Sequence, residues 1–177
     1  MLPLKSPISN STCPVYGKSI KINSLVCVAA NAIAPGKRPL SSMSPTIVTR
    51  AGKPLLVLGT PGGSRIITMV LLGVLGYADG LDAQQVAALP RYHHQWLPDV
   101  VDTERDALPD DVIAALRAMG HVVVTPKDAA GGQRSSDTWG NLQTVEWNLR
   151  DNTLHGGSDP RNPVGEAKVE AVPATAP

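Results

Sequence analysis

The feature that most limits how this chain can fold is the apolar run at residues 66–75, Ile-Ile-Thr-Met-Val-Leu-Leu-Gly-Val-Leu. Only Thr68 carries a polar side chain in this run, so a helix through it is apolar on nearly every face. A helix of this kind belongs in a protein interior, and its ten residues fall well short of the roughly 20 that span a bilayer. The run therefore predicts a buried helix in a layered protein and not a membrane anchor.

Two shorter apolar runs precede that helix and predict a β-hairpin. They are residues 47–49 (Ile-Val-Thr) and residues 55–58 (Leu-Leu-Val-Leu), and residues 50–54 between them contain a glycine and a proline, which favour a turn. We therefore expect two strands joined by a five-residue turn. Such a hairpin brings the residues before the first strand close to those after the second.

Serines and glycines occupy the two segments that this hairpin brings together. Ser41 and Ser42 precede the first strand, and Gly62 and Gly63 follow the second, at the start of the predicted helix. N–H groups at a helix start have no intrahelical acceptor, and the macrodipole adds partial positive charge there. From residue chemistry alone, this helix start is either an anion site, for a carboxylate or a developing oxyanion, or an ordinary tight turn.

Four motifs in a fixed order make the sequence recognisable. They are residues 37–46 (Lys-Arg-Pro-Leu-Ser-Ser-Met-Ser-Pro-Thr), 59–66 (Gly-Thr-Pro-Gly-Gly-Ser-Arg-Ile), 90–96 (Pro-Arg-Tyr-His-His-Gln-Trp) and 157–161 (Gly-Ser-Asp-Pro-Arg). Together they resemble the γ-glutamyltransferase (glutathione hydrolase) family, in the C-terminal part of its small subunit. The resemblance implies an α/β layered fold, the αββα sandwich of N-terminal-nucleophile hydrolases, of which this chain would form a part.

The resemblance also implies roles for the serines and glycines. Ser41 and Ser42 would hold the α-carboxylate of a γ-glutamyl group, and Gly62 and Gly63 would form the oxyanion hole. The complete enzyme would transfer the γ-glutamyl group of glutathione or a related amide, through an ester on a threonine, to water or to an amino acid or peptide acceptor. The resemblance implies no metal or organic cofactor, and it implies a periplasmic or extracellular location.

The catalytic threonine is the main departure from the family pattern. In the family it begins the small subunit, farther upstream than this chain extends, and no Thr-Thr-His-like segment precedes Ser41. We therefore assign no nucleophile in this chain and expect it to be inactive in isolation. One alternative is a catalytically incomplete remnant, or a subunit that works only with large-subunit and N-terminal small-subunit sequence as its partner. Another is a related acylase that cuts β-lactam side chains.

Three regions follow from the motifs and from composition. Residues 1–29, with three prolines and no sustained period, are predicted to be irregular and to lie outside the family match. Residues 30–165 form the family region, and the Ala/Val/Pro/Glu-rich residues 166–177 are predicted to be a disordered tail. We find no signal-peptide pattern, because the early apolar segment is too short.

Further elements are predicted within the family region. Asp82 can cap a short helix over residues 83–88, and an amphipathic helix should run from Pro109 to Gly120, followed by a strand at 122–124. Residues 126–141 are predicted to be a mobile loop. Residues 142–149 and 153–155 should form a hairpin whose core-facing side chains are Gln143, Val145, Trp147 and Leu149.

Charge and motif content exclude several classes of function. Sixteen basic against fifteen acidic residues give a net charge of +1, so the chain lacks the electrostatic footprint of a protein that binds nucleic acid or an anionic membrane. It contains no Gly-x-Ser-x-Gly elbow, Walker loop or dinucleotide-binding loop. Cys13 and Cys27 lack metal-ligand spacing and are expected to be free thiols.

Two other motifs are better explained by structure than by catalysis. His93 and His94 are adjacent, so in a strand they point to opposite faces and cannot easily bind one metal ion. We expect packing or hydrogen bonding there. Asp159 and Arg161 flank a proline, and we expect this pair to tie a loop to the core.

Overall fold

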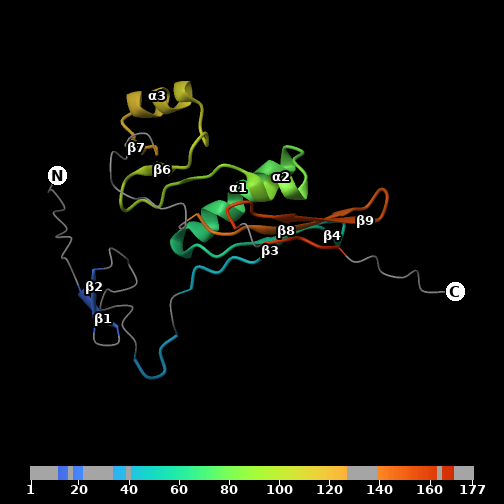
Figure 1. Ribbon diagram of the computed structural model, residues 1–177, viewed down its shortest axis with the longest axis horizontal. Helices are drawn as coiled ribbons and strands as arrows, with labels where there is room; N and C mark the ends of the chain where they lie inside the picture. The colour runs from blue at the N-terminus through green and yellow to red at the C-terminus, as the bar shows by residue number, and fades with distance from the viewer. Residues whose placement is uncertain are drawn as a thin grey trace. The chain divides into compact units, whose positions relative to one another are not determined.

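The computed structural model describes residues 12–15, 18–21, 34–38, 41–126, 139–162 and 165–169 (Figure 1). The chain divides into two compact units, Met1–Ser41 and Ser42–Pro177. In the first unit, β1 (Thr12–Val15) and β2 (Lys18–Lys21) pair as antiparallel strands. These residues therefore have strand conformation, where the sequence predicted irregular chain.

The second unit is built on a four-stranded antiparallel sheet with the order β3-β4-β8-β9. The strands are β3 (Thr46–Arg50), β4 (Lys53–Gly59), β8 (Gln143–Asn148) and β9 (Thr153–Ser158). Both predicted hairpins, β3-β4 and β8-β9, are confirmed. The central pair, β4 and β8, joins segments that are far apart in the sequence.

The predicted five-residue turn of the first hairpin was wrong. Arg50 pairs with Lys53, so only Ala51 and Gly52 lie in the loop. Both have positive φ, 50° and 79°, as a two-residue type I′ turn requires. This turn matches the right-handed twist of the strands, which explains why the strands extend farther than the apolar runs indicated.

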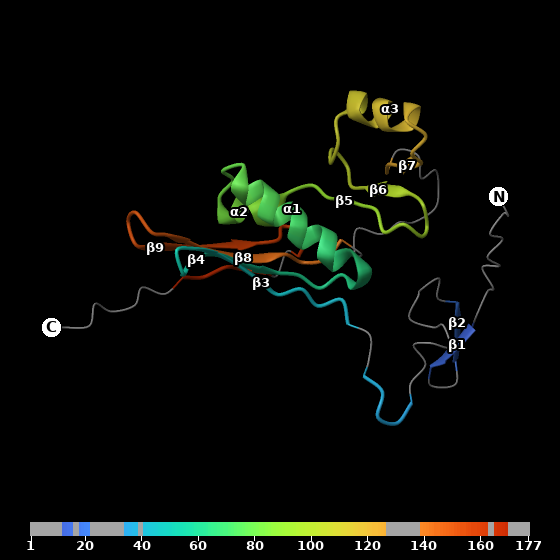
Figure 2. The ribbon, with the colours of Figure 1, turned by 180° about the vertical axis from the view of Figure 1, so that it is seen from behind.

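Helix α1 (Ile66–Ala78) follows the short 3₁₀ turn η3 (Gly63–Arg65) and lies with α2 (Ala83–Ala88) on one face of the sheet (Figures 1 and 2). Side chains of the sheet and both helices form the core: Leu56, Leu58, Ile66, Met69, Val70, Val86 and Leu142. Asp82 caps α2 as predicted, in a reciprocal capping box with Gln85.

The prediction that α1 is buried all round was wrong. Ile67, Leu71 and Leu75 are 61%, 53% and 49% exposed. In the described part of the chain, only one face of the helix has a sheet to pack against. No helix in that part is long and apolar enough to cross a membrane.

A second, three-stranded sheet has the order β5-β6-β7 and carries α3 (Asp110–Ala118). Its strands are β5 (Tyr92–His93), β6 (Val101–Thr103) and β7 (Val123–Val124). The predicted amphipathic helix and the strand after it are therefore confirmed. Ile113 of α3 is buried, whereas Val112 and Met119, the residue directly after the helix, are exposed.

The side-chain face predicted for β8 was wrong. Leu142 and Thr144 are buried and Val145 is 43% exposed, which is the reverse of the prediction. The cause is α2: the Thr144 hydroxyl donates to the Ala83 carbonyl at 2.7 Å, and the Ala83 N–H donates to Glu146 at 3.3 Å. Polar contacts with α2 thus place this less apolar side of the strand inward.

The opposite face of the main sheet carries apolar side chains in register. Ile47 pairs with Val57, and Val57 pairs with Val145, so the three side chains form a row across three strands. They are 63%, 43% and 43% exposed. Most of the predicted mobile loop, Cys27 and residues 170–177 lie outside the described residues, and Cys13 is described only as a backbone position of β1.

Candidate functional site

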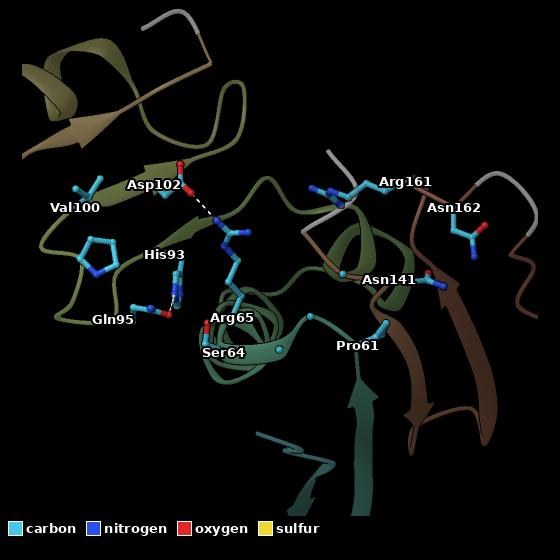
Figure 3. A pocket seen from close by; sticks show the side chains of 14 residues that line it. Pro61, Ser64, Arg65, His93, Gln95, Val100, Asp102, Asn141, Arg161 and Asn162 are labelled. Atoms are coloured by element: carbon cyan, nitrogen blue, oxygen red, sulfur yellow. Dashed lines mark hydrogen bonds and ion pairs between the residues drawn. The ribbon is translucent and has the colours of Figure 1, made fainter. Parts of the chain in front are cut away.

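A cavity of about 730 Å³ opens beside the glycine-rich turn at the start of α1 (Figure 3). Its walls are formed by the turn, by the segment from β5 to β6, by residues 140–141 before β8 and by residues 161–162 after β9. The lining residues are Pro61, Gly62, Gly63, Ser64, Arg65, His93, Gln95, Pro98, Val100, Asp102, Gly140, Asn141, Arg161 and Asn162.

The turn itself depends on glycine. Gly62 and Gly63 have φ values of 152° and 59°, a region that L-residues rarely adopt. A Cβ atom on Gly62 would lie 2.3 Å from Cε of Met69 in the core. Within the turn, the Arg65 N–H donates to the Gly62 carbonyl at 3.2 Å. N–H groups of a first helical turn have no intrahelical acceptor, so this turn can bind an anion at the cavity wall.

Arg65 holds the C-terminal end of the turn in place. Its guanidinium donates to Asp102 of β6 at 2.6 Å (Figure 3). The guanidinium also lies 4.6 Å from the ring centroid of Trp139. The ion pair and the cation–π contact therefore join the turn to two segments that are distant in sequence. Sequence reasoning missed Asp102 and Trp139, because no local pattern marks a partner that far along the chain.

His93 forms part of the opposite wall, and its hydrogen bonds determine its tautomer. Gln95 donates through Nε2 to the Leu97 carbonyl at 2.9 Å, so its Oε1 faces His93 Nε2 at 3.0 Å. Nε2 must then carry the proton, and Nδ1 accepts from the Thr68 hydroxyl at 2.8 Å. The predicted hydrogen-bonding role is confirmed for buried His93, while exposed His94 lies beside Asp99.

A network of charged side chains includes Arg161, which lines the cavity. Asp159 accepts from the Arg91 guanidinium at 2.6 Å and from the Arg161 guanidinium at 2.9 Å. Arg161 also pairs with Glu104, to which the Arg91 N–H donates at 2.8 Å. The prediction that Asp159 and Arg161 tie a loop to the core is confirmed, and Arg161 additionally lines the cavity.

Opposing effects set the pKa of Asp159. Burial acts to raise this pKa, but N–H groups of Arg161 and Leu142 and the two guanidinium groups donate to the carboxylate. Their combined effect outweighs burial and holds the pKa of Asp159 below its ordinary value. The carboxylate therefore remains ionised in the core and, together with Glu104, balances the charges of Arg91 and Arg161.

The predicted site residues are only partly brought together. Gly62 and Gly63 line the cavity, but neither Ser41 nor Ser42 is among the described residues around it. The Ser44 hydroxyl donates to the Ser42 carbonyl at 3.2 Å, just before β3. The roles assigned to these serines and glycines stay predictions. Among residues 34–38, 41–126, 139–162 and 165–169, no three His, Cys, Asp or Glu side chains cluster as metal ligands do.

The chain matches a known protein family over most of its length. The family model "Gamma-glutamyltranspeptidase" matches residues 16–169, a match that starts earlier than the boundary at residue 30 drawn from the motifs. The chain is 46% identical over 134 residues to a Glutathione hydrolase proenzyme of Escherichia coli, covering 75% of this chain and 21% of that protein. A Glutathione hydrolase proenzyme of Pseudomonas sp. is 42% identical, with 78% and 24% covered. The chain thus spans about a quarter or less of these curated relatives.

Solved structures show the same fold. A gamma-glutamyltranspeptidase of Helicobacter pylori is similar with a TM-score of 0.64 and 38% identity, over 76% of this chain and 69% of that chain. The corresponding protein of Pseudomonas nitroreducens, complexed with L-DON, gives 0.62 and 40%, over 81% and 68%. A cephalosporin acylase from Bacillus halodurans, at 0.62 and 24% identity, resembles the chain in fold alone.

Proposed function

Because the chain belongs to the gamma-glutamyltranspeptidase family, we propose that it supplies the oxyanion-binding part of a γ-glutamyl transfer site. The observation that carries this proposal is the turn at Gly62 and Gly63, which presents a helix start to a cavity large enough for a peptide-sized ligand. The donor class is γ-glutamyl amides such as glutathione, and the acceptor is water, an amino acid or a peptide.

In this proposal the turn acts when the γ-glutamyl carbonyl becomes tetrahedral. The N–H groups of Gly62 and Gly63 donate to the negative oxygen, at a contribution of about 3–4 kcal/mol per donor by analogy with other oxyanion holes. The left-handed φ of Gly63 and the Arg65–Asp102 ion pair hold the turn in one conformation before substrate binds. Preorganised donors need no rearrangement as charge develops.

Ser41 and Ser42 would orient the donor by donating hydroxyl hydrogen bonds to its α-carboxylate. The antiparallel register of β3 and β4 supports this role for Ser42. Thr46 pairs with Leu58, so the residues before Thr46 and the residues after Leu58 lie at the same end of the hairpin. The proposal assigns no residue of this chain as nucleophile. Attack on the γ-glutamyl carbonyl belongs to the family's threonine, and the substrate passes through a γ-glutamyl ester.

The function of the whole enzyme requires family sequence that lies outside the region matched by this chain. Coverage of 21% and 24% of the curated relatives favours a chain that works together with the remaining family sequence, supplied in cis or by a partner. By resemblance, such an enzyme acts in the periplasm or outside the cell.

A chimera tests the proposed function directly. The 134 matched residues of the Escherichia coli relative are replaced by those of this chain, and p-nitroaniline release from γ-glutamyl-p-nitroanilide is measured. We expect turnover by the chimera, its loss with Gly62→Pro, and a raised KM with Ser42→Ala. Gly59→Ala is the matched glycine control, because a Cβ there has open space. A folded chimera without turnover would contradict the proposal, as would one in which Gly62→Pro has no effect.

A further inference from the structure

The segment just before β8, residues 139–141, contacts the glycine-rich turn at both of its ends, and we call it the clamp segment. At the C-terminal end of the turn, the Arg65 guanidinium lies over the ring of Trp139, 4.6 Å from its centroid. At the N-terminal end, the Asn141 N–H donates to the Thr60 hydroxyl oxygen at 3.0 Å. The clamp segment therefore touches the turn on either side of its two glycines.

The middle residue of the clamp segment, Gly140, approaches the backbone of the turn closely. Its φ is 77°, and a Cβ atom there would lie 2.4 Å from both the Pro61 carbonyl oxygen and Oγ1 of Thr60. A residue with a side chain would not fit in this place. The Thr60 hydroxyl completes the contact, because it accepts from Asn141 and donates to the Pro61 carbonyl at 2.7 Å.

A buried ion pair holds the clamp segment itself. The Trp139 carbonyl accepts from the Arg91 guanidinium, and the Leu142 N–H donates to Asp159 at 2.8 Å. Arg91 and Asp159 pair with each other at 2.6 Å and are each 1% exposed. The segment is thus tied at both ends to one buried pair, which makes it a fixed support for the turn.

The turn needs support from outside because of its composition. Gly62 and Gly63 are consecutive, and glycine has more backbone freedom than any other residue. The direction of their N–H groups therefore depends on what holds the residues on either side. The ion pair of Arg65 with Asp102 holds one side only, whereas the clamp segment contacts both.

We propose that the clamp segment positions the glycine-rich turn for γ-glutamyl transfer, so that the N–H groups of the turn point at the developing oxyanion. The inference rests on the proposed function, because it concerns the same oxyanion-binding turn. Trp139 and Asn141 act through the turn in this proposal and are positioning residues. Oxyanion donors act when the carbonyl becomes tetrahedral, so displacement of the turn lowers kcat and leaves KM unchanged.

The test uses the chimera described above and the same p-nitroaniline assay. Trp139→Ala removes the ring beside Arg65, and Thr60→Val removes the acceptor of the Asn141 N–H. We expect each change to lower kcat by about 10- to 100-fold, with KM within about twofold of the native value. Trp139→Phe and Thr60→Ser keep the ring and the hydroxyl and should restore most of the rate. Trp147→Ala, at a tryptophan that does not line this cavity, is the matched control and should leave kcat unchanged.

Amide hydrogen exchange of residues 60–65 gives a second readout that does not need turnover. We expect faster exchange in Trp139→Ala and Thr60→Val, and no change in Trp147→Ala. A native chimera that releases no p-nitroaniline counts against the proposed function alone. The exchange rates then decide whether the clamp segment holds the turn.

Three results would overturn the inference. Unchanged exchange in folded Trp139→Ala and Thr60→Val would show that the clamp segment does not hold the turn. Faster exchange with unchanged kcat in an active chimera would show that the contacts serve the fold only. A raised KM with unchanged kcat would assign these residues to substrate binding and not to positioning.

Discussion

At the scale of single residues, Asp159 is a buried charge paired with two arginines, so the folded state depends on it. It is 1% exposed and neutralises Arg91, which is equally buried. Asp159→Asn leaves that guanidinium in the core without its counter-charge, so we expect a loss of about 3–5 kcal/mol in the free energy of unfolding. Urea denaturation measures this loss. Asp99→Asn, at a side chain 84% exposed, is the control and should change little.

The same carboxylate makes stability depend on pH. Its pKa is lower in the folded than in the unfolded chain, so its contribution is complete above the unfolded value of about 3.9 and is lost as the pH falls through the folded value. We expect the denaturation midpoint to decline below about pH 4 in the native chain. The Asp159→Asn variant should show a flatter decline, and an identical pH profile would contradict this assignment.

His93 gives a second test at this scale. Its contacts with Gln95 and Thr68 require the tautomer with the proton on Nε2, which ¹⁵N-detected histidine spectra distinguish from the Nδ1 form. Thr68→Val removes the donor to Nδ1 and should cost about 1–3 kcal/mol, the penalty of an unsatisfied buried acceptor. The same change at exposed Thr49 should be neutral. A spectrum of the Nδ1-protonated form would refute the hydrogen-bond assignment.

At the scale of elements, the contact of α2 with β9 depends on a glycine in the strand. A Cβ on Gly157 would lie 2.1 Å from the backbone oxygen of Ala83, which cannot move aside as a side chain can. Gly157→Ala should therefore push α2 off the sheet at a cost of about 1–3 kcal/mol or more. Gly59→Ala, in β4 with open space around it, is the matched control. Equal melting temperatures for the two variants would show that α2 does not pack so closely.

Local signals explain which elements could be predicted. The cap at Asp82, the proline before α3 and the alternation of β8 are short-range patterns, and each identified its element correctly. The inward face of β8 was not predictable in this way, because two hydrogen bonds over 61 and 63 residues of sequence decide it: the Thr144 hydroxyl donates to the Ala83 carbonyl, and the Ala83 N–H donates to Glu146. The walls of the cavity escaped prediction for the same reason: Asp102 lies 37 residues from Arg65.

At the scale of the whole molecule, the family could be identified from the sequence because each motif is a contiguous stretch of residues. Burial could not be predicted in the same way, because it depends on layers that other sequence can supply. Two apolar groups of side chains are exposed: the row of Ile47, Val57 and Val145 on the sheet, and Ile67, Leu71 and Leu75 on α1. Among the described residues, helices lie on one face of the main sheet (Figures 1 and 2), so the αββα sandwich implied by the resemblance is present in part. Two unpaired apolar surfaces of this kind favour association between chains.

We therefore expect the chain produced alone to aggregate or to remain partly molten. Val57→Thr with Val145→Thr keeps two β-branched side chains in their strands but lowers the apolarity of the row, so it should reduce association without loss of sheet structure. Light scattering and binding of a hydrophobic dye measure the effect, and circular dichroism reports the sheet. The control, Thr153→Val, adds an apolar group at exposed β9 and should not reduce association. A sharp cooperative melt from a monomer of the native chain would contradict this expectation, because it would show that the described layers alone complete the core.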